Sequence, residues 1–175
     1  VKQAGLPLAP ALAALASFSE VEGRGKAVTL RLAAGDVLMM DDSYNASPAA
    51  MRAAFAKLDE QWKLAGSKGR KVALLGDMLE LGVEGPAMHA ALSDDLVARG
   101  FHLVALAGPL MKHLHAALPS EMRGPHVMES KQLMPLLAKL IQAGDYVLVK
   151  GSHGSKMYEI ATALTGASLE KKHAV

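Results

Sequence analysis

The chain has 175 residues, 51% of them hydrophobic and none of them cysteine, and its 19 basic and 17 acidic side chains leave a formal net charge of +2. This length fits one domain, or one domain with a remnant of a neighbour, and the missing cysteine excludes disulfides and cysteine-bound metals. The balanced charge argues against nucleic acid or an anionic membrane as a partner. The longest apolar stretch, residues 6–18, contains two prolines and is shorter than the roughly 18–20 residues of a membrane span.

The first 25 residues predict a short helix followed by a domain boundary. Leu8, Leu12 and Leu15 fall on one face of a helix over residues 7–17. Two glycines then bracket Arg24 in a turn, so we place the boundary near residues 18–22. Because Val1 is not an initiator methionine, we expect the chain to be a piece of a longer protein.

Strand and helix patterns alternate after this boundary. Residues 28–32 and 37–40 are apolar strands joined by a short glycine-containing connection, which indicates an antiparallel hairpin. Further apolar strands are expected at 71–75, 103–107, 126–128 and 145–150, separated by helical patterns. The alternation predicts an α/β fold, a Rossmann-like three-layer sandwich with a mostly parallel sheet plus an N-terminal antiparallel strand or hairpin.

Capping residues and apolar spacing locate the helices. The first begins at Pro48 with Ser47 as its N-cap. The second covers residues 86–99 with Met88 facing the core, and the third covers 110–118. Ser130 is expected to cap a fourth helix that continues to residue 141, and the last helix follows residue 155. The apolar stripe of the first helix consists of Met51, Phe55, Leu58 and Trp62.

Three polar loops follow strands of the predicted sheet, at residues 41–47, 76–82 and 151–155. The carboxyl ends of parallel strands lie at one edge of a sheet, and ligands of open α/β sheets usually bind at that edge. The three loops are therefore expected to converge on one site.

The residues of the first loop leave several roles open. Asp41 and Asp42 could bind Mg²⁺, orient a ribose or cap a turn, and adjacent side chains at a strand end diverge, so their roles should differ. Tyr44 is more often a packed ring than a shelf for adenine. Asn45 is more often a turn former than a residue that recognises a base.

The other two loops are less specific. Met78, Leu79 and Leu81 are expected to be exposed, where they could pack on a neighbour or line a cleft, and Asp77 with Glu80 could act as an acid–base pair. Lys150 precedes a glycine- and serine-rich turn into a helix, which favours an anion such as a phosphate or a carboxylate. The chain contains no Walker A pattern, no zinc-binding histidine spacing and no nucleophile turn of the G-x-S-x-G type.

Four segments, at residues 23–26, 41–48, 75–82 and 149–157, resemble the C-terminal part of the Mur ligase family in order and spacing. The resemblance extends from about Gly5 to Leu164, and the string DDSYNASP at 41–48 is its most specific part. Two positions depart from the family pattern, which commonly has asparagine where Ser47 stands and arginine where His153 stands.

The resemblance implies a cytoplasmic, monomeric, ATP-dependent amide ligase of peptidoglycan synthesis that joins D-Ala-D-Ala to UDP-N-acetylmuramoyl-tripeptide. In such ligases ATP phosphorylates the peptide carboxylate, and the amine of the dipeptide then attacks the acyl phosphate. By the same resemblance, residues 20–170 would be the C-terminal domain, residues 1–19 the remnant of the central ATPase domain, and residues 171–175 a tail. The Walker A lysine and the Mg²⁺ ligands would belong to the central domain, so the chain alone should be inactive.

Site residues follow from the resemblance by position. Arg24 would contact the phosphate–ribose region of ATP and Asp42 its ribose, with Tyr44 and Asn45 beside the adenine. No catalytic residue and no metal ligand is expected in this chain. The candidates for contact with D-Ala-D-Ala are Asp77, Met78, Lys150, Ser152 and His153.

Two other functions are alternatives to a ligase domain. The chain could be a stand-alone nucleotide- or anion-binding module, or an interaction domain that uses the loop at 78–79.

Overall fold

The computed structural model describes residues 9, 10, 13 and 23–170. The helix expected over 7–17 falls mostly outside these residues, and the boundary near 18–22 and the tail at 171–175 fall outside them. Six strands form one sheet in the order β1-β2-β6-β3-β4-β5. The strands are β1 (Lys26–Leu32), β2 (Gly35–Asp42), β3 (Lys71–Gly76), β4 (Leu103–Ala107), β5 (Arg123–Val127) and β6 (Tyr146–Lys150).

Strand directions confirm the expected hairpin and the mostly parallel sheet. β1 and β2 are antiparallel, and the four other pairs of neighbouring strands are parallel. Every residue of β3 is buried, which is typical of a parallel strand that helices cover on both faces.

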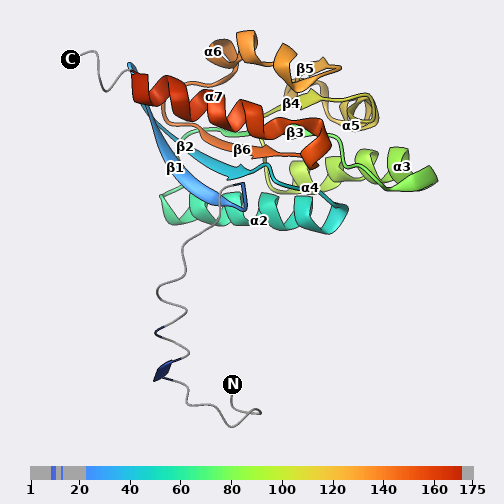
Figure 1. Cartoon of the computed structure of the whole chain (residues 1–175), viewed down its shortest axis with the longest axis horizontal. Coiled ribbons are helices and arrows are strands. Elements are labelled where there is room, and N and C mark those ends of the chain that lie inside the picture. Colours follow the sequence, from blue (N-terminus) through green and yellow to red (C-terminus); the bar gives the residue numbers. More distant parts are fainter. Residues whose placement is uncertain (1–8, 11–12, 14–22, 171–175) are drawn as a thin grey trace.

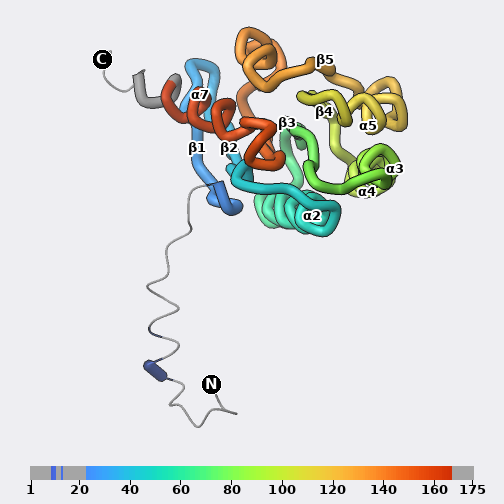
Figure 2. Tube along the Cα trace, turned by 45° about the vertical axis from the view of Figure 1, so that its right-hand side comes forward, coloured from blue at the N-terminus to red at the C-terminus, as the bar shows by residue number. Residues whose placement is uncertain are grey.

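Helices form the two outer layers of the sandwich (Figure 1). α2 (Pro48–Leu64), α4 (Leu92–Ala98) and α5 (Met111–Ala117) pack on one face of the sheet, while α6 (Leu137–Leu140) and α7 (Met157–Glu170) pack on the other. Figure 2 shows α7 beside β1, with α2 on the opposite side. The remaining elements are α3 (Gly85–Ala90) and short 3₁₀ turns at Gly82–Glu84, Ser120–Met122, Ser130–Gln132, Met134–Leu136 and His153–Ser155.

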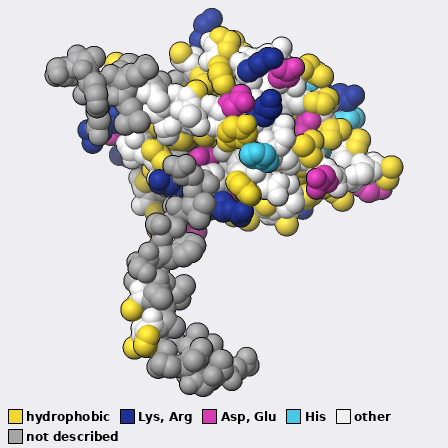
Figure 3. Space-filling model, in the orientation of Figure 1, with side chains coloured by type: hydrophobic (Ala, Val, Ile, Leu, Met, Phe, Trp, Pro, Cys, Tyr) yellow, Lys and Arg dark blue, Asp and Glu magenta, His cyan; other side chains and the backbone are white. Residues whose placement is uncertain are grey.

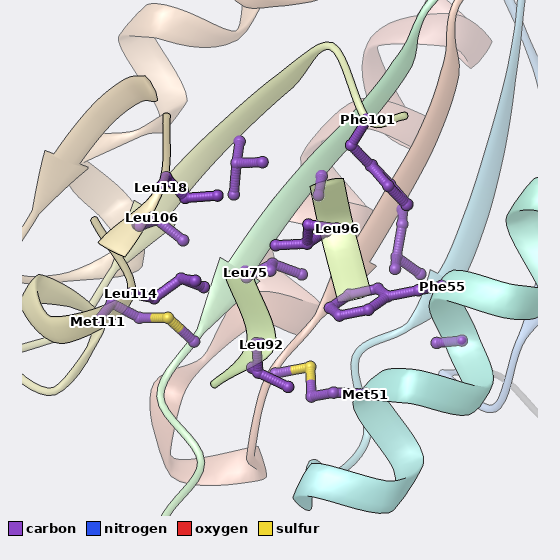
Figure 4. Packing of buried hydrophobic residues seen from close by; sticks show 14 of the residues in the cluster. Met51, Phe55, Leu75, Leu92, Leu96, Phe101, Leu106, Met111, Leu114 and Leu118 are labelled. Carbon is purple, nitrogen blue, oxygen red and sulfur yellow. The ribbon is translucent and has the colours of Figure 1, made fainter. Parts of the chain in front are cut away.

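The larger hydrophobic cluster lies between α2, α4, α5 and the sheet (Figure 4). Phe55 of α2 meets Phe101 edge-on, with 5.6 Å between the ring centroids. Each large side chain buried in this way contributes roughly 1.5–3 kcal/mol. Met51, Phe55 and Leu58 are fully buried as expected, so the apolar stripe of α2 holds this helix against the sheet.

Capping explains where α2 begins. The hydroxyl of Ser47 accepts a hydrogen bond from the N–H of Ala50 at 3.2 Å, and Pro48 occupies the first turn, where its missing N–H has no helical partner. The predicted cap and first residue are therefore confirmed.

Two expected helices differ from the structure. The pattern at 86–99 forms α3 and α4, separated at Ala91, and Met88 is 36% exposed while its neighbour His89 is buried. The pattern at 130–141 forms two 3₁₀ turns before the short α6, because Pro135 lacks the N–H that a continuous helix needs. Glu129, not Ser130, caps the first of these turns, in a capping box with Gln132.

The strand order also brings the three polar loops together. β6 lies between β2 and β3, parallel to both, with Lys150 in register with Asp42 on one side and with Leu75 on the other. The loops that follow these strands therefore leave the same edge of the sheet side by side, as expected. Positive and negative side chains are interspersed on the face seen in Figure 3. Among the described helices, none has the length and apolar character to cross a membrane.

Candidate functional site

The two adjacent carboxylates at the end of β2 have different partners. Asp41 folds the loop, because its Oδ1 accepts hydrogen bonds from the N–H of Ser43 at 3.1 Å and from the Ser43 hydroxyl at 2.6 Å. Asp42 pairs with Lys150, whose Nζ lies 2.5 Å from Asp42 Oδ2. The two side chains diverge, as expected, and bind different partners.

Lys150 ends the buried strand β6 and is 2% exposed. Besides Asp42, its ammonium donates to the carbonyl of Asn45 at 2.9 Å. A buried charge is tolerated when it is paired and hydrogen-bonded. Lys150 therefore fixes the loop after β2 from the neighbouring strand.

A cleft of about 480 Å³ opens between this loop, the turn before β1 and the helix α2; we call it the first cleft. All four residues that the sequence assigns to a nucleotide line it, so the structure brings them together although they come from two segments. Its polar and charged lining consists of Arg24, Asp42, Tyr44, Asn45, Ser47, Lys57 and Lys150.

Arg24 and Tyr44 are stacked at the entrance of the first cleft. The guanidinium carbon of Arg24 lies 4.2 Å from the ring centroid of Tyr44, and the Tyr44 side chain is exposed. The row continues on the other side of Tyr44, where His153 is 5.9 Å away and Tyr158 stacks on His153 at 5.1 Å, centroid to centroid. Tyr44 is thus an exposed ring in contact with Arg24 and His153, and not a packed core residue.

A second cleft, of about 560 Å³, lies on the other side of Tyr44 and Asn45. Ser152 holds its walls together, because its hydroxyl accepts a hydrogen bond from the N–H of Leu79 at 2.9 Å and lies 3.4 Å from the carbonyl of Ala46. The second cleft is lined by Tyr44, Asn45, Ala46, Ser47, Leu79, Glu80, Leu81, Ser152, His153 and Gly154.

The expected exposure of Met78 is wrong. Met78 is fully buried, and its N–H donates to Nε2 of the buried His89 at 2.9 Å, while Nδ1 of that ring lies 2.6 Å from the carbonyl of Gly85. The donor N–H on one side and the acceptor carbonyl on the other assign the neutral ring with its proton on Nδ1. Of the three apolar residues of this loop, Leu79 is exposed, at 41%, and Leu81 is half-buried.

Asp77 stabilises the helix beyond the next strand. Its carboxylate accepts hydrogen bonds from the N–H groups of Leu110 at 3.1 Å and Met111 at 2.9 Å, at the start of α5. Burial raises the pKa of Asp77 above its ordinary value, and these two backbone hydrogen bonds oppose the rise. Asp77 lines a third cleft, of about 560 Å³, with Lys156 and residues of the segment 128–131.

The five candidates for the dipeptide are therefore distributed over several surroundings. Ser152 and His153 line the second cleft, Lys150 lines the first, and Asp77 lines the third. Four of the five are buried, and His153 is exposed.

In the part of the chain that the structure describes, no three His, Asp or Glu side chains lie close enough together to hold a metal ion. A nucleotide, in contrast, needs hydrogen-bond acceptors for its sugar, a cation for its phosphates and an apolar surface for its base. The first cleft offers all three, in Asp42, Arg24 and Tyr44.

Two residues near the clefts were not predicted from the sequence. Lys57 lines the first cleft and donates to the carbonyl of Gly25 at 2.8 Å, and His89 fixes the backbone of the loop after β3. Lys57 lies on α2 between Ala56 and Leu58, and nothing in the local sequence distinguishes it from a solvated lysine. His89 would have been identified if the buried face of the helical pattern at 86–99 had been assigned to His89 instead of its neighbour Met88.

Comparison with known proteins gives the same family along most of the chain. The family model "Mur ligase, glutamate ligase domain" matches residues 13–153. A UDP-N-acetylmuramoyl-tripeptide–D-alanyl-D-alanine ligase of Escherichia coli (strain K12) is 35% identical over 154 residues, which cover 87% of this chain and 31% of that protein. The ligase of the same name from Bacillus subtilis (strain 168) is 34% identical over 139 residues, 75% of this chain and 28% of that protein.

Solved structures agree with this likeness. A crystal structure of MurF from Acinetobacter baumannii has a TM-score of 0.74 at 25% identity and covers 92% of this chain and 34% of that one. MurF ligase from Thermotoga maritima in complex with ADP has a TM-score of 0.68 at 26% identity, with 90% and 34% covered. The chain thus spans about a third of the length of the relatives that it matches.

Proposed function

The chain belongs to the Mur ligase family, and from this membership we propose that it is the C-terminal domain of an ATP-dependent ligase that joins D-Ala-D-Ala to UDP-N-acetylmuramoyl-tripeptide. The proposal assigns ATP to the first cleft and the dipeptide to the second. Mg²⁺, the Walker A lysine and the tripeptide would be held by other domains of the ligase. Its monomeric state and its location in the cytoplasm stay predictions from the resemblance.

The observation that carries the proposal is the convergence of Arg24, Asp42, Tyr44 and Asn45 on the first cleft. One oxygen of Asp42 is engaged by Lys150, which leaves the other to accept a hydrogen bond from a ribose hydroxyl. Arg24, which lies over the ring of Tyr44, would turn its planar cation to phosphate oxygens, and this movement would free the face of the exposed Tyr44 ring for a purine. The relative from Thermotoga maritima was solved with ADP, which supports a nucleotide in this family.

The second cleft suits the incoming dipeptide because of its position. It shares Tyr44, Asn45, Ala46 and Ser47 with the first cleft, so ligands in the two clefts would be separated by one loop. Both ligands would thus be held at one edge of the sheet, and closure of the other domains over it would bring the amine to the carboxylate that ATP has activated.

The proposed reaction uses this chain for positioning. ATP transfers its γ-phosphoryl group to the tripeptide carboxylate, which gives an acyl phosphate and ADP. The amine of D-Ala-D-Ala then attacks the acyl carbon, and the tetrahedral intermediate releases phosphate and a proton as the amide forms. Residues of this chain orient the nucleotide and the amine, and the gain in rate comes from this alignment of the reacting groups.

A chain exchange tests the proposal. We would replace the matching C-terminal third of the Escherichia coli relative with this chain and measure amide formation from UDP-N-acetylmuramoyl-tripeptide, D-Ala-D-Ala and ATP. The proposal predicts an active hybrid that loses apparent affinity for ATP when Arg24 is changed to alanine. Asp94→Asn, a change of an exposed residue of α4, serves as the control.

Two outcomes of the chain exchange would contradict the proposal. A hybrid that is folded by circular dichroism and still binds UDP-N-acetylmuramoyl-tripeptide, yet forms no amide, would reject the proposed function. An active hybrid in which Arg24→Ala leaves the apparent affinity for ATP unchanged would reject the nucleotide assignment of the first cleft.

A further inference from the structure

Lys150 is the largest buried charged side chain in the neighbourhood of both clefts, and its surroundings restrict what it can do. The three residues before it in β6, Val147, Leu148 and Val149, are fully buried and apolar. A lysine at the end of such a strand requires partners, because an unpaired buried ammonium is costly. Its role therefore depends on what its ammonium already binds.

The donor capacity of this ammonium is largely used within the protein. A lysine has three N–H donors and no acceptor. Lys150 Nζ lies 2.5 Å from Asp42 Oδ2, 2.9 Å from the carbonyl of Asn45 and 3.4 Å from the carbonyl of Asp42. The side chain is 2% exposed, so an incoming carboxylate or phosphate would have to displace one of these partners.

The side chain also belongs to one cleft rather than the other. Lys150 lines the first cleft and is absent from the lining of the second, whose nearest residue on the same loop is Ser152. Resemblance alone places Lys150 beside the dipeptide, but its position and its partners associate it with the nucleotide.

We propose that Lys150 is a positioning residue for nucleotide binding, which orients the carboxylate of Asp42 and holds the loop through Asn45, and is not a ligand of the dipeptide. This inference rests on the proposed function of the first cleft. By binding Oδ2, Lys150 turns the other carboxylate oxygen of Asp42 toward Gly25, at the edge of the first cleft. By binding the carbonyl of Asn45, it fixes the backbone between Tyr44 and the start of α2.

The test compares two ligands on the 175-residue chain. Separate NMR titrations with ATP and with D-Ala-D-Ala would give a dissociation constant for each in the wild type and in Lys150→Met, which keeps the length of the side chain and removes the charge. We expect Lys150→Met to weaken ATP binding about tenfold or more, the loss of a hydrogen bond that involves a charged group, and to change D-Ala-D-Ala binding less than about twofold. Lys139→Met, on the exposed surface of α6, is the matched control and should change neither constant.

A double-mutant cycle separates positioning from general damage. If Lys150 acts through Asp42, Lys150→Met should weaken ATP binding much less in an Asp42→Asn background than in the wild type. Equal losses in both backgrounds would overturn the inference that Lys150 acts by orienting Asp42. A loss of D-Ala-D-Ala binding with ATP binding intact would also overturn it, and would favour the dipeptide role.

A measurement on the wild-type chain covers the case in which Lys150→Met fails to fold. The ¹⁵N signal of the Lys150 ammonium should shift on addition of ATP and stay in place on addition of D-Ala-D-Ala, and the reverse pattern would refute the inference. ATP shifts at Asp42 without any at Lys150 would overturn the inference alone. The absence of ATP shifts at both residues would reject the proposed nucleotide site and the inference with it.

Discussion

The ammonium of Lys150 lies 2.5 Å from a carboxylate oxygen of Asp42, although 108 positions separate the two residues in the chain. The contact exists because β6 is inserted between β2 and β3, which places the two residues in register at the ends of parallel strands. It joins two loops whose convergence the sequence predicts without this contact, and it determines which oxygen of Asp42 stays open to a ligand.

The first prediction concerns this open oxygen. Asp42→Asn should weaken ATP binding about 10- to 100-fold, because a hydrogen bond to a charged group contributes roughly 1.5–3 kcal/mol. Calorimetric titration of the chain with ATP measures the loss, and Asp94→Asn on α4 is the control. An Asp42→Asn variant that binds ATP as tightly as the wild type would exclude a direct contact between Asp42 and the nucleotide.

The second prediction concerns the ion pair at the opposite edge of the sheet. Lys71 Nζ lies 2.5 Å from Asp59 Oδ1, and both side chains are buried. Lys71→Met should lower the free energy of unfolding by about 1.5–3 kcal/mol, because Asp59 keeps its ion pair with Lys63 and loses the buried hydrogen bond from Lys71. Urea denaturation followed by the fluorescence of Trp62, whose ring centroid lies 4.1 Å from Lys71 Nζ, measures the change.

Exposed Lys139 provides the comparison for that measurement, since Lys139→Met should alter the free energy of unfolding by less than about 0.5 kcal/mol. Similar losses for Lys71→Met and Lys139→Met would mean that the buried pair contributes nothing to stability.

The third prediction concerns Gly108, which follows β4 with a φ of +125°. A Cβ atom there would lie 2.3 Å from the carboxyl carbon of Asp77, so the carboxylate that caps α5 would have to move. Gly108→Ala should destabilise the protein by about 2–4 kcal/mol, the sum of overpacking and backbone strain. Gly100→Ala has the strain without the clash, since nothing lies within 4 Å of its Cβ position, and should cost about 1–2 kcal/mol. Thermal unfolding would rank the two variants, and the opposite order would contradict this account of the contact.

The fourth prediction concerns the pH dependence that Asp77 introduces. Burial raises the pKa of Asp77 above its ordinary value of 3.8, so the folded state keeps this proton to a higher pH than the unfolded state does. This carboxyl group therefore lowers the free energy of unfolding as the pH rises from below 3.8 through its raised pKa. Asp77→Asn keeps an oxygen for the N–H groups of α5 and removes the ionisation.

The measurement for Asp77 is a series of urea denaturations at different pH values for the wild type and Asp77→Asn. The stability of Asp77→Asn relative to the wild type should increase as the pH rises through this interval. A constant difference would show that the pKa of Asp77 is the same in the folded and unfolded states.

The elements with strong local signals could be predicted from the sequence. Ser47 and Pro48 fix the start of α2 by capping chemistry, and the alternation of apolar strands with helices gives the parallel sheet. The two expected helices that differ from the structure were harder to predict. At 130–141 the leucines have helical spacing although Pro135 interrupts the helix, and at 86–99 the buried face of α3 differs by one residue from the expected face. Tertiary packing decides such cases.

For the candidate site, the sequence predicts which residues lie there better than it predicts the contacts that they make. The fold class predicts that the three loops share one edge of the sheet, and the strand order, which the sequence does not predict, places them side by side. The partners of Lys150, the burial of Met78 and the capping role of Asp77 depend on contacts between residues far apart in the chain, about which periodicity and turn chemistry carry no information.

The nucleotide footprint on the 175-residue chain tests the central claim most directly. Addition of ATP to the ¹⁵N-labelled chain should shift the amide signals of residues 23–25 and 42–45, all of which except Ser43 line the first cleft. The signals of residues 128–131 in the third cleft should stay in place. Shifts confined to the third cleft, or no shift at residues 23–25 and 42–45 at saturating ATP, would contradict the assignment of the nucleotide to the first cleft.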